Sequence, residues 1–148
     1  DSSILDGDGG HFTKEELQKL QQALDENQDA HVMISMHHQP VAVGSAWMDT
    51  MLIDNADEFF KIIDGHDNIR CLLWGHIHQI VDDTRKDVRL LGTPSTCIQF
   101  IPGKDDFGIA DEAPGYRWIG LLPDGSIESG IKRLPEVPPD IDFNSFGY

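Results

Sequence analysis

Two short apolar runs in the first half of the chain each end at histidines. The first run, HVMISM at residues 31–36, ends at His-His-Gln-Pro, and Pro40 cannot continue a hydrogen-bonded ladder. The second run, IRCLLW at residues 69–74, ends at Gly75 and is followed by His76. Short uninterrupted apolar runs are typical of strands that are buried on both faces. We therefore predict two buried strands.

Each predicted strand follows a segment with the spacing of a helix. In the first segment, three leucines between residues 17 and 24 fall on one face, and Thr13 with Glu16 forms a capping box. The second segment has Asp54 as its candidate N-cap and Gly65 as its stop. The order strand, helix, strand predicts two parallel strands that are joined by a crossover.

After Gly75 the pattern changes to short strand-like runs separated by polar turns. Residues 78–92 and 116–134 each predict a hairpin, and the second surrounds the turn signal Pro-Asp-Gly at residues 123–125. The later half is therefore expected to be mostly antiparallel. Residues 135–148 carry three prolines in their first five positions and no amphipathic period, which predicts an extended C-terminal tail.

Composition narrows the class of protein. The chain has 148 residues, 39% of them hydrophobic, which fits one domain with a sizeable core. No apolar run approaches the roughly 20 residues of a membrane span, so we expect a soluble globular protein without a membrane partner. Eleven Lys and Arg against 26 Asp and Glu give a formal net charge of −15, which opposes binding to nucleic acid. Any phosphate group that the protein handles would need metal ions to offset that field.

Cysteine use and the first residue bear on the compartment. Cys71, in an apolar run, and Cys97 do not make a disulfide framework, so we expect a reducing cytoplasm. The missing signal peptide carries little weight because the chain begins with Asp1 instead of Met. We expect a truncated or processed chain.

The opening DGDGGHFTKEE imitates a calcium-binding loop. If Asp6 and Asp8 take the third and fifth loop positions, Gly9 and Glu15 fall at the sixth and twelfth, where an EF-hand needs Gly and Glu. The first position falls on Ile4, however, and there is no room upstream for an entering helix. A surface turn that leads into a capped helix is the plainer interpretation.

Histidines follow both predicted buried strands. His37 and His38 come at the end of the first strand, and His76 and His78 come at the end of the second. Ligands collect at the carboxyl ends of parallel strands in open α/β sheets, and neutral imidazole is a favoured ligand for Zn, Fe, Mn or Ni. We therefore favour a metal site over the alternative, in which each imidazole caps a strand or binds a backbone carbonyl.

The spacing of the last two histidines requires a bend. In a continuing strand, the side chains of His76 and His78 would point to opposite faces of the sheet. Two imidazoles that are aimed at one place therefore need the chain to leave strand geometry. Gly75 is the residue that can bend at the lowest steric cost, so we predict the bend there.

These motifs resemble a known family. A strand ending in MHHQP and a later strand ending in GHIH look like the C-terminal half of a calcineurin-like metallophosphoesterase. The stretches GSAWMD, GHIHQ, TPSTCIQF and APGYRW are similar to the bacterial 3',5'-cyclic AMP phosphodiesterases of that superfamily. The resemblance covers residues 1–134 and leaves the tail, residues 135–148, outside. It implies an α/β fold, the C-terminal portion of a sandwich of two mixed sheets flanked by helices, with antiparallel hairpins in its later part.

The resemblance also implies a dinuclear centre, commonly of Fe, Mn or Zn. His37 matches a ligand that follows the late strand, His76 matches a second ligand to the same ion, and His78 matches a ligand to the other ion. His38 would sit beside the phosphate of a bound substrate. In such a site, two metal ions polarise the phosphoryl oxygens and activate the attacking water, while the departing ribose oxygen needs a proton donor.

The family's N-terminal motifs, of the types DxH, GDxxD and GNHD, supply the bridging Asp, further ligands and the acid histidine. This chain does not contain that set. The resemblance thus implies that the intact protein hydrolyses 3',5'-cyclic nucleotides and that the chain alone is inactive. A phosphodiesterase of broader specificity, or a noncatalytic assembly or binding domain, remains an alternative. Expected partners are a cyclic nucleotide and either a second copy of the chain or the missing N-terminal half.

Overall fold

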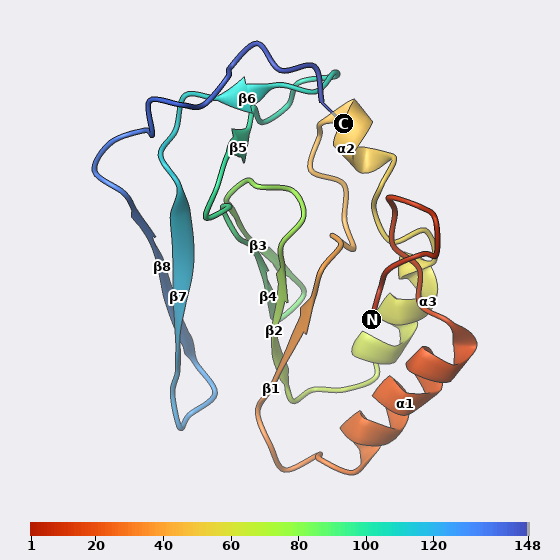
Figure 1. Cartoon of the computed structure of the whole chain (residues 1–148). Helices are drawn as coiled ribbons and strands as arrows, with labels where there is room; N and C mark the ends of the chain where they lie inside the picture. The colour runs from red at the N-terminus through yellow and green to blue at the C-terminus, as the bar shows by residue number, and fades with distance from the viewer. Residues whose placement is uncertain (148) are drawn as a thin grey trace.

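A computed structural model describes residues 1–147, and a four-stranded sheet lies at its centre (Figure 1). Its strands run in the order β1-β2-β4-β3, listed as β1 (Val32–Met36), β2 (Ile69–Trp74), β3 (Val81–Arg85) and β4 (Val88–Gly92). Strand β2 lies parallel to both β1 and β4, while β3 and β4 form an antiparallel hairpin. The predicted parallel pair and the first predicted hairpin are both confirmed.

The two predicted strands differ in burial. In β2, Cys71, Leu72 and Trp74 are buried, as predicted. Strand β1 lies at the edge of the sheet, and none of its residues is fully buried. The prediction of a buried strand was therefore wrong for β1, most of whose residues are only half-buried. An apolar run cannot show whether a strand has one neighbour or two.

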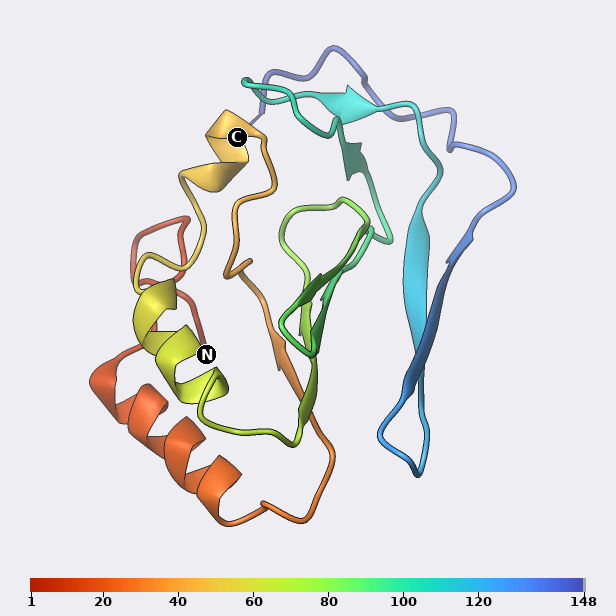
Figure 2. The ribbon, with the colours of Figure 1, turned by 180° about the vertical axis from the view of Figure 1, so that it is seen from behind.

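Two helices cover one face of this sheet. These are α1 (Lys14–Asp25) and α3 (Ala56–Ile63), which pack beside each other next to β1 (Figures 1 and 2). A shorter helix, α2 (Ala46–Asp49), lies in the loop after β1. Their buried side chains, including Leu24 and Phe59, join those of β2 in one hydrophobic core. Within residues 1–147, no helix is both long and apolar enough to cross a bilayer.

The two helix starts were predicted with different success. Thr13 and Glu16 form the predicted capping box of α1. The N-cap of α3 is Asn55, so the prediction of Asp54 was wrong by one residue. The reason lies outside the helix, because the side chain of Asn55 accepts a hydrogen bond from the Phe12 amide at 3.0 Å and donates to the Phe12 carbonyl at 2.8 Å. This pair of bonds ties the start of α3 to the segment that precedes α1.

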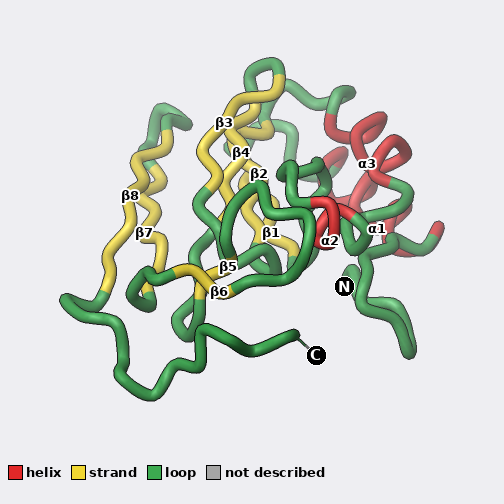
Figure 3. The backbone as a smooth tube through the Cα atoms, turned by 90° about the horizontal axis from the view of Figure 1, so that it is seen from above, coloured by secondary structure: helices red, strands yellow, loops and turns green. Residues whose placement is uncertain are grey.

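Two antiparallel hairpins complete the fold, confirming the antiparallel character predicted for the later part. The pair β5 (Gln99–Phe100) and β6 (Ile109–Ala110) is short, whereas β7 (Gly115–Leu121) and β8 (Ile127–Arg133) pair over their full length. The long hairpin lies on the face of the central sheet opposite the helices (Figure 3). Helices, central sheet and long hairpin thus form successive layers of an α/β fold.

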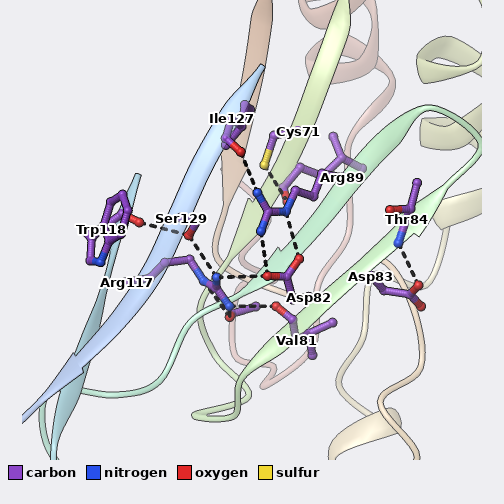
Figure 4. A network of polar contacts seen from close by, with 12 residues as sticks. Cys71, Val81, Asp82, Asp83, Thr84, Arg89, Arg117, Trp118, Ile127 and Ser129 are labelled. Carbon is purple, nitrogen blue, oxygen red and sulfur yellow. Dashed lines mark hydrogen bonds and ion pairs between the residues drawn. The ribbon is translucent and has the colours of Figure 1, made fainter. Parts of the chain in front are cut away.

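One arginine attaches the long hairpin to the central sheet (Figure 4). The side chain of Arg117 is only 2% exposed, and it donates hydrogen bonds to the carbonyl oxygens of Val81 and Gly92 and to the hydroxyl of Ser129. Asp82 lies 3.8 Å from the Arg117 guanidinium, and Arg89 binds both oxygens of that carboxylate. The guanidinium therefore joins β7 to the ends of β3 and β4.

The first ten residues and the described C-terminal residues form no helix or named strand. Ser3 and Gly10 form an isolated antiparallel bridge, and Asp6 and Asp8, which mimic a calcium loop in the sequence, lie in the exposed turn between them. Residues 134–147 contain no helix or strand and pass over β6 toward α2 (Figure 1). Tyr148, the last residue of the predicted tail, lies outside the described residues.

Candidate metal centre

The histidines gather where β1 and β2 end side by side. Met36 is paired with Trp74 at the last position of the parallel ladder, and the Gly75 amide donates to the His37 carbonyl at 3.2 Å. This register places the residues that follow β1 against those that follow β2. The common edge that the sequence predicts for the histidines is therefore present.

Three imidazoles form a group that we call the histidine cluster: His37, His38 and His76. One ring nitrogen from each lies within 4.8 Å of one from each of the others. The ring centroids lie 4.8 Å apart for His37 and His38, 5.1 Å for His37 and His76, and 4.7 Å for His38 and His76. Neighbouring rings in such an arrangement can present their nitrogens to one small ion.

His78 stands beside the histidine cluster and is not a member of it. Its ring stacks on Phe100, with 4.3 Å between centroids and an interplanar angle of 6°. Phe100 in turn packs edge-on against Trp47, with centroids 5.1 Å apart. The structure thus groups three of the four histidines singled out in the sequence, and the fourth, His78, stacks on the ring of Phe100.

The bend that turns the two later histidines lies at the histidines themselves. His76 has φ 58° and His78 has φ 49°, both in the left-handed region, whereas Gly75 does not have a positive φ. The prediction of a bend at Gly75 was therefore wrong. Left-handed backbone costs a non-glycine residue about 1 to 3 kcal/mol and needs surroundings that enforce it. Ile77, between the two histidines, is fully buried in the core, so its packing provides that enforcement.

Burial favours the neutral form of three of these imidazoles, those of His38, His76 and His78. Burial, followed by repulsion from His38 and His37, lowers the pKa of His76 from 6.5 to about 4. Burial is likewise the main cause of the lowered pKa of His78 and of His38. At neutral pH these rings therefore keep the free nitrogen lone pair that a metal ion requires.

Two buried nitrogens fit a metal centre directly. Nε2 of His76 and Nδ1 of His78 are buried and have no hydrogen-bond partner within residues 1–147. An unpaired buried polar atom costs about 1 to 3 kcal/mol, which coordination to an ion would recover. The donor set consists of imidazoles, because no carboxylate among the described residues joins the histidine cluster. The residues present thus fit a metal ion.

Sequence reasoning missed the residues that support His38. Ser2 is 2% exposed, and its hydroxyl lies 2.8 Å from Nδ1 of His38. The Cα of Gly10 lies so close to His38 that an added Cβ would stand 2.7 Å from the Cβ of that histidine. No local sequence pattern predicts either contact, because Ser2 and Gly10 lie in the turn-rich N-terminal segment and contact His38 only in the folded chain.

One apparent motif lies far from the cluster. The letters D-x-H occur at Asp29–His31, in the loop that leads into β1. These residues line a polar pocket of about 470 Å³ together with Asp25 and His66. Because His31 precedes β1 and His37 follows it, this pocket lies at the opposite end of the strand from the histidine cluster.

Comparisons with known proteins agree with this geometry. The chain is 43% identical over all 148 residues to the 3',5'-cyclic adenosine monophosphate phosphodiesterase CpdA of Pseudomonas aeruginosa, of which it covers 54%. It is 33% identical to the protein of the same name from Escherichia coli K12, again over the whole chain and 54% of the relative. A 3',5'-cyclic-nucleotide phosphodiesterase of Nostoc is 36% identical over 138 residues, which make up 93% of the chain and 52% of that protein. The chain spans about half the length of these relatives.

The fold is also found in a solved structure. A dimetal phosphatase from Danio rerio superposes with a TM-score of 0.55 and 17% identity, covering 81% of this chain and 36% of that one. This likeness concerns the fold alone. No family model matches the chain. Over its whole length the chain is thus similar to about half of the length of the bacterial 3',5'-cyclic AMP phosphodiesterases, and it shares its fold with a dimetal phosphatase.

Proposed function

We propose that this chain forms part of a metal-dependent phosphodiesterase that hydrolyses 3',5'-cyclic nucleotides, in particular cyclic AMP, to nucleoside 5'-monophosphates. The observation that carries the proposal is the histidine cluster, where three imidazoles meet at the ends of two parallel strands. The names of the relatives that match the whole chain support the reaction and the substrate class.

His37 and His76 would hold one metal ion, and His78 would hold a second. Imidazole ligands suit iron, manganese or zinc. His78 lies outside the 4.8 Å group, and its unpaired Nδ1 supports its assignment to a separate ion. When bound, such a pair of ions stabilises charge on the phosphoryl oxygens and activates water. The fold shared with a dimetal phosphatase supports the count of two.

His38 would contact the phosphate of the substrate. Its ring lies against His37 and His76, and its exposed fraction of 5% leaves it little contact with bulk water. The protein as a whole carries a formal charge of −15 and therefore repels an anionic diester at long range. A neutral donor next to the metal ligands would attract the phosphate at short range without adding negative charge.

The chain alone would bind metal weakly and show no turnover. Its described residues offer imidazoles to the centre but no carboxylate to bridge two ions. Strand β1 has a neighbour on only one side, and an apolar pocket of about 320 Å³ lies between α1 and β1, next to His37. Edge strands readily pair with another chain. We therefore propose association through β1, either with a second copy or with the remaining half of the relatives' length.

The proposed compartment is the cytoplasm. Cys71 and Cys97 are both free, and the structure pairs neither of them in a disulfide. Burial raises the pKa of the Cys71 thiol to about 11, which suppresses the reactive thiolate form. A reducing compartment suits a protein whose second cysteine, Cys97, is exposed.

The deciding experiment assays the full-length protein, loaded with Mn²⁺, on cyclic AMP and on a chromogenic phosphodiester. We expect hydrolysis of cyclic AMP to 5'-AMP, and we expect His76→Ala to abolish it while His31→Ala leaves it unchanged. The matched control is sound because His31 lies at the opposite end of β1.

Two other outcomes point elsewhere. Turnover of the chromogenic diester without turnover of cyclic AMP would favour a phosphodiesterase of broader specificity. Metal binding without turnover of either substrate would favour a noncatalytic assembly domain. Light scattering on the isolated chain tests the proposed association, and a stable monomer would contradict it.

A further inference from the structure

We propose that Ser2 is a positioning residue that fixes the tautomer of His38. The hydroxyl of Ser2 donates to Nδ1 of His38, which places the imidazole proton on Nε2. His38 then carries a hydrogen-bond donor at Nε2 instead of a lone pair. The group that accepts this hydrogen bond would be an anionic phosphate ester, and this part of the inference rests on the proposed function. The assignment of the tautomer does not depend on it.

The contact is short and enclosed. Oγ of Ser2 lies 2.8 Å from Nδ1 of His38, and the two residues are 2% and 5% exposed. The backbone amide of His38 also donates to the same hydroxyl oxygen, at 3.4 Å. Ser2 thus contacts both the main chain and the ring of one histidine, 36 residues away along the chain.

The direction of the hydrogen bond follows from counting donors and acceptors. A serine hydroxyl has one proton and can accept two hydrogen bonds. Within residues 1–147, the Ser2 hydroxyl contacts only the His38 amide, which can only donate, and Nδ1 of His38. If Nδ1 carried the proton, the buried hydroxyl proton would have no acceptor, and an unsatisfied buried group is unfavourable. The satisfied arrangement places the proton of His38 on Nε2.

The backbone around Ser2 holds this arrangement in place. The His11 amide donates to the Ser2 carbonyl at 3.0 Å, and the neighbouring Ser3 pairs with Gly10 in an antiparallel bridge. Gly10 itself stands directly against the His38 ring, where an added Cβ would lie 2.9 Å from Cγ. The ring of His38 is therefore held between Gly10 and Ser2, with Nδ1 at the Ser2 hydroxyl.

This arrangement gives two adjacent histidines different chemistry. A metal ligand must present a lone pair, whereas recognition of a phosphate oxygen needs an N–H donor. Because Nδ1 of His38 is occupied by the Ser2 hydroxyl, Nε2–H is the donor that this ring has left, and the backbone carbonyls of Asp8 and Ser2 are the acceptors that the chain itself offers to the ring until a ligand competes for it. His37 has no such partner among the hydrogen bonds of the described side chains, and its ring stays free to act as a ligand.

The test reads the tautomer from long-range ¹H–¹⁵N spectra of the chain labelled with ¹⁵N-histidine. For His38 we expect a protonated Nε2 and an Nδ1 shifted by an accepted hydrogen bond. Ser2→Ala should move the Nδ1 resonance to the position of an unbonded nitrogen, and Ser2→Thr should restore it. Ser3→Ala is the matched control, because the hydroxyl of Ser3 is exposed and bonds only Asp1 among the described residues. A proton on Nδ1 in the unmodified chain would overturn the proposal.

A kinetic experiment distinguishes failure of this inference from failure of the proposed function. In the full-length Mn²⁺-loaded protein, Ser2→Ala should lower kcat/KM for a phosphodiester about tenfold, at unchanged metal content, with Ser3→Ala near the unmodified value. A fall in bound metal in Ser2→Ala would show that His38 is a ligand and would refute the donor role. If the unmodified protein hydrolyses no diester while the tautomer is as expected, the proposed function fails and the role of Ser2 stands.

Discussion

Replacing Arg117 by methionine should cost the protein about 3 to 4 kcal/mol of its free energy of unfolding. The guanidinium, 2% exposed, donates to the carbonyls of Val81 and Gly92 and to the hydroxyl of Ser129. Each hydrogen bond to a charged group contributes roughly 1.5 to 3 kcal/mol, which the desolvation of the buried charge partly offsets. Removing the guanidinium leaves the carbonyls of Val81 and Gly92 without this donor, at about 1 to 3 kcal/mol for each buried group left unsatisfied, which sets the expected size.

The assay is urea unfolding followed by tryptophan fluorescence, because Trp118 lies on the hairpin that Arg117 attaches. Lys132→Met is the matched control: this residue lies on the partner strand, is exposed, and should change stability by less than about 0.5 kcal/mol. Arg117→Lys should fall between the two, since an ammonium keeps the charge but cannot reach all of the acceptors. A loss below about 1 kcal/mol in Arg117→Met would refute the view that this residue joins the two layers.

Three further changes test the acid stability, the packing around His38 and the metal centre. Arg85, together with Lys86, lowers the pKa of Asp64 to about 2, so the carboxylate should contribute about 1 kcal/mol above pH 4. That contribution should disappear as the pH falls toward 2 and should be absent in Asp64→Asn, as measured by urea unfolding across that range. Gly10→Ala should destabilise the chain by about 2 kcal/mol, because its Cβ would stand 2.7 Å from His38. His76→Ala should weaken Zn²⁺ binding, measured by calorimetry, by more than the roughly tenfold typical of a supporting residue.

Each of these expectations has an outcome that contradicts it. A pH dependence that survives in Asp64→Asn would assign the effect to other carboxylates. Gly9→Ala is the control for Gly10, since its added Cβ would meet Met51 at an ordinary 3.6 Å, and equal losses in both variants would remove the steric explanation. Zn²⁺ affinity unchanged by His76→Ala would contradict its assignment as a ligand.

The sequence predicted the parts of the fold that depend on local pattern. The capping box at Thr13 and Glu16 and the turn before Ser126 involve neighbours in the chain, and both occur as expected. The edge position of β1 and the N-cap of α3 at Asn55 were missed, because each depends on contacts with distant segments. Periodicity carries no information on which strands have two neighbours, or on what Phe12 will meet 43 residues later.

The candidate site divides in the same way. Parallel strands bring their ends together, so the meeting of His37 and His76 follows from the strand order alone. The contact of Ser2 with His38 does not, because a serine in a turn-rich segment has no periodicity that would indicate its partner. The bend at His76 escaped prediction for a related reason: local sterics favour Gly75, but the burial of Ile77 decides where the chain turns.

The left-handed turn at His76 and His78 makes metal affinity depend on an apolar side chain. Ile77 is 0% exposed, and while it stays in the core, the flanking imidazoles remain in place without help from an ion. Binding then requires little loss of conformational entropy, because folding has already ordered the rings. A smaller side chain at position 77 would let the loop relax toward extended backbone and disperse the rings. Affinity for metal would then fall because the rings are no longer preorganised, although every coordinating atom is still present in the chain.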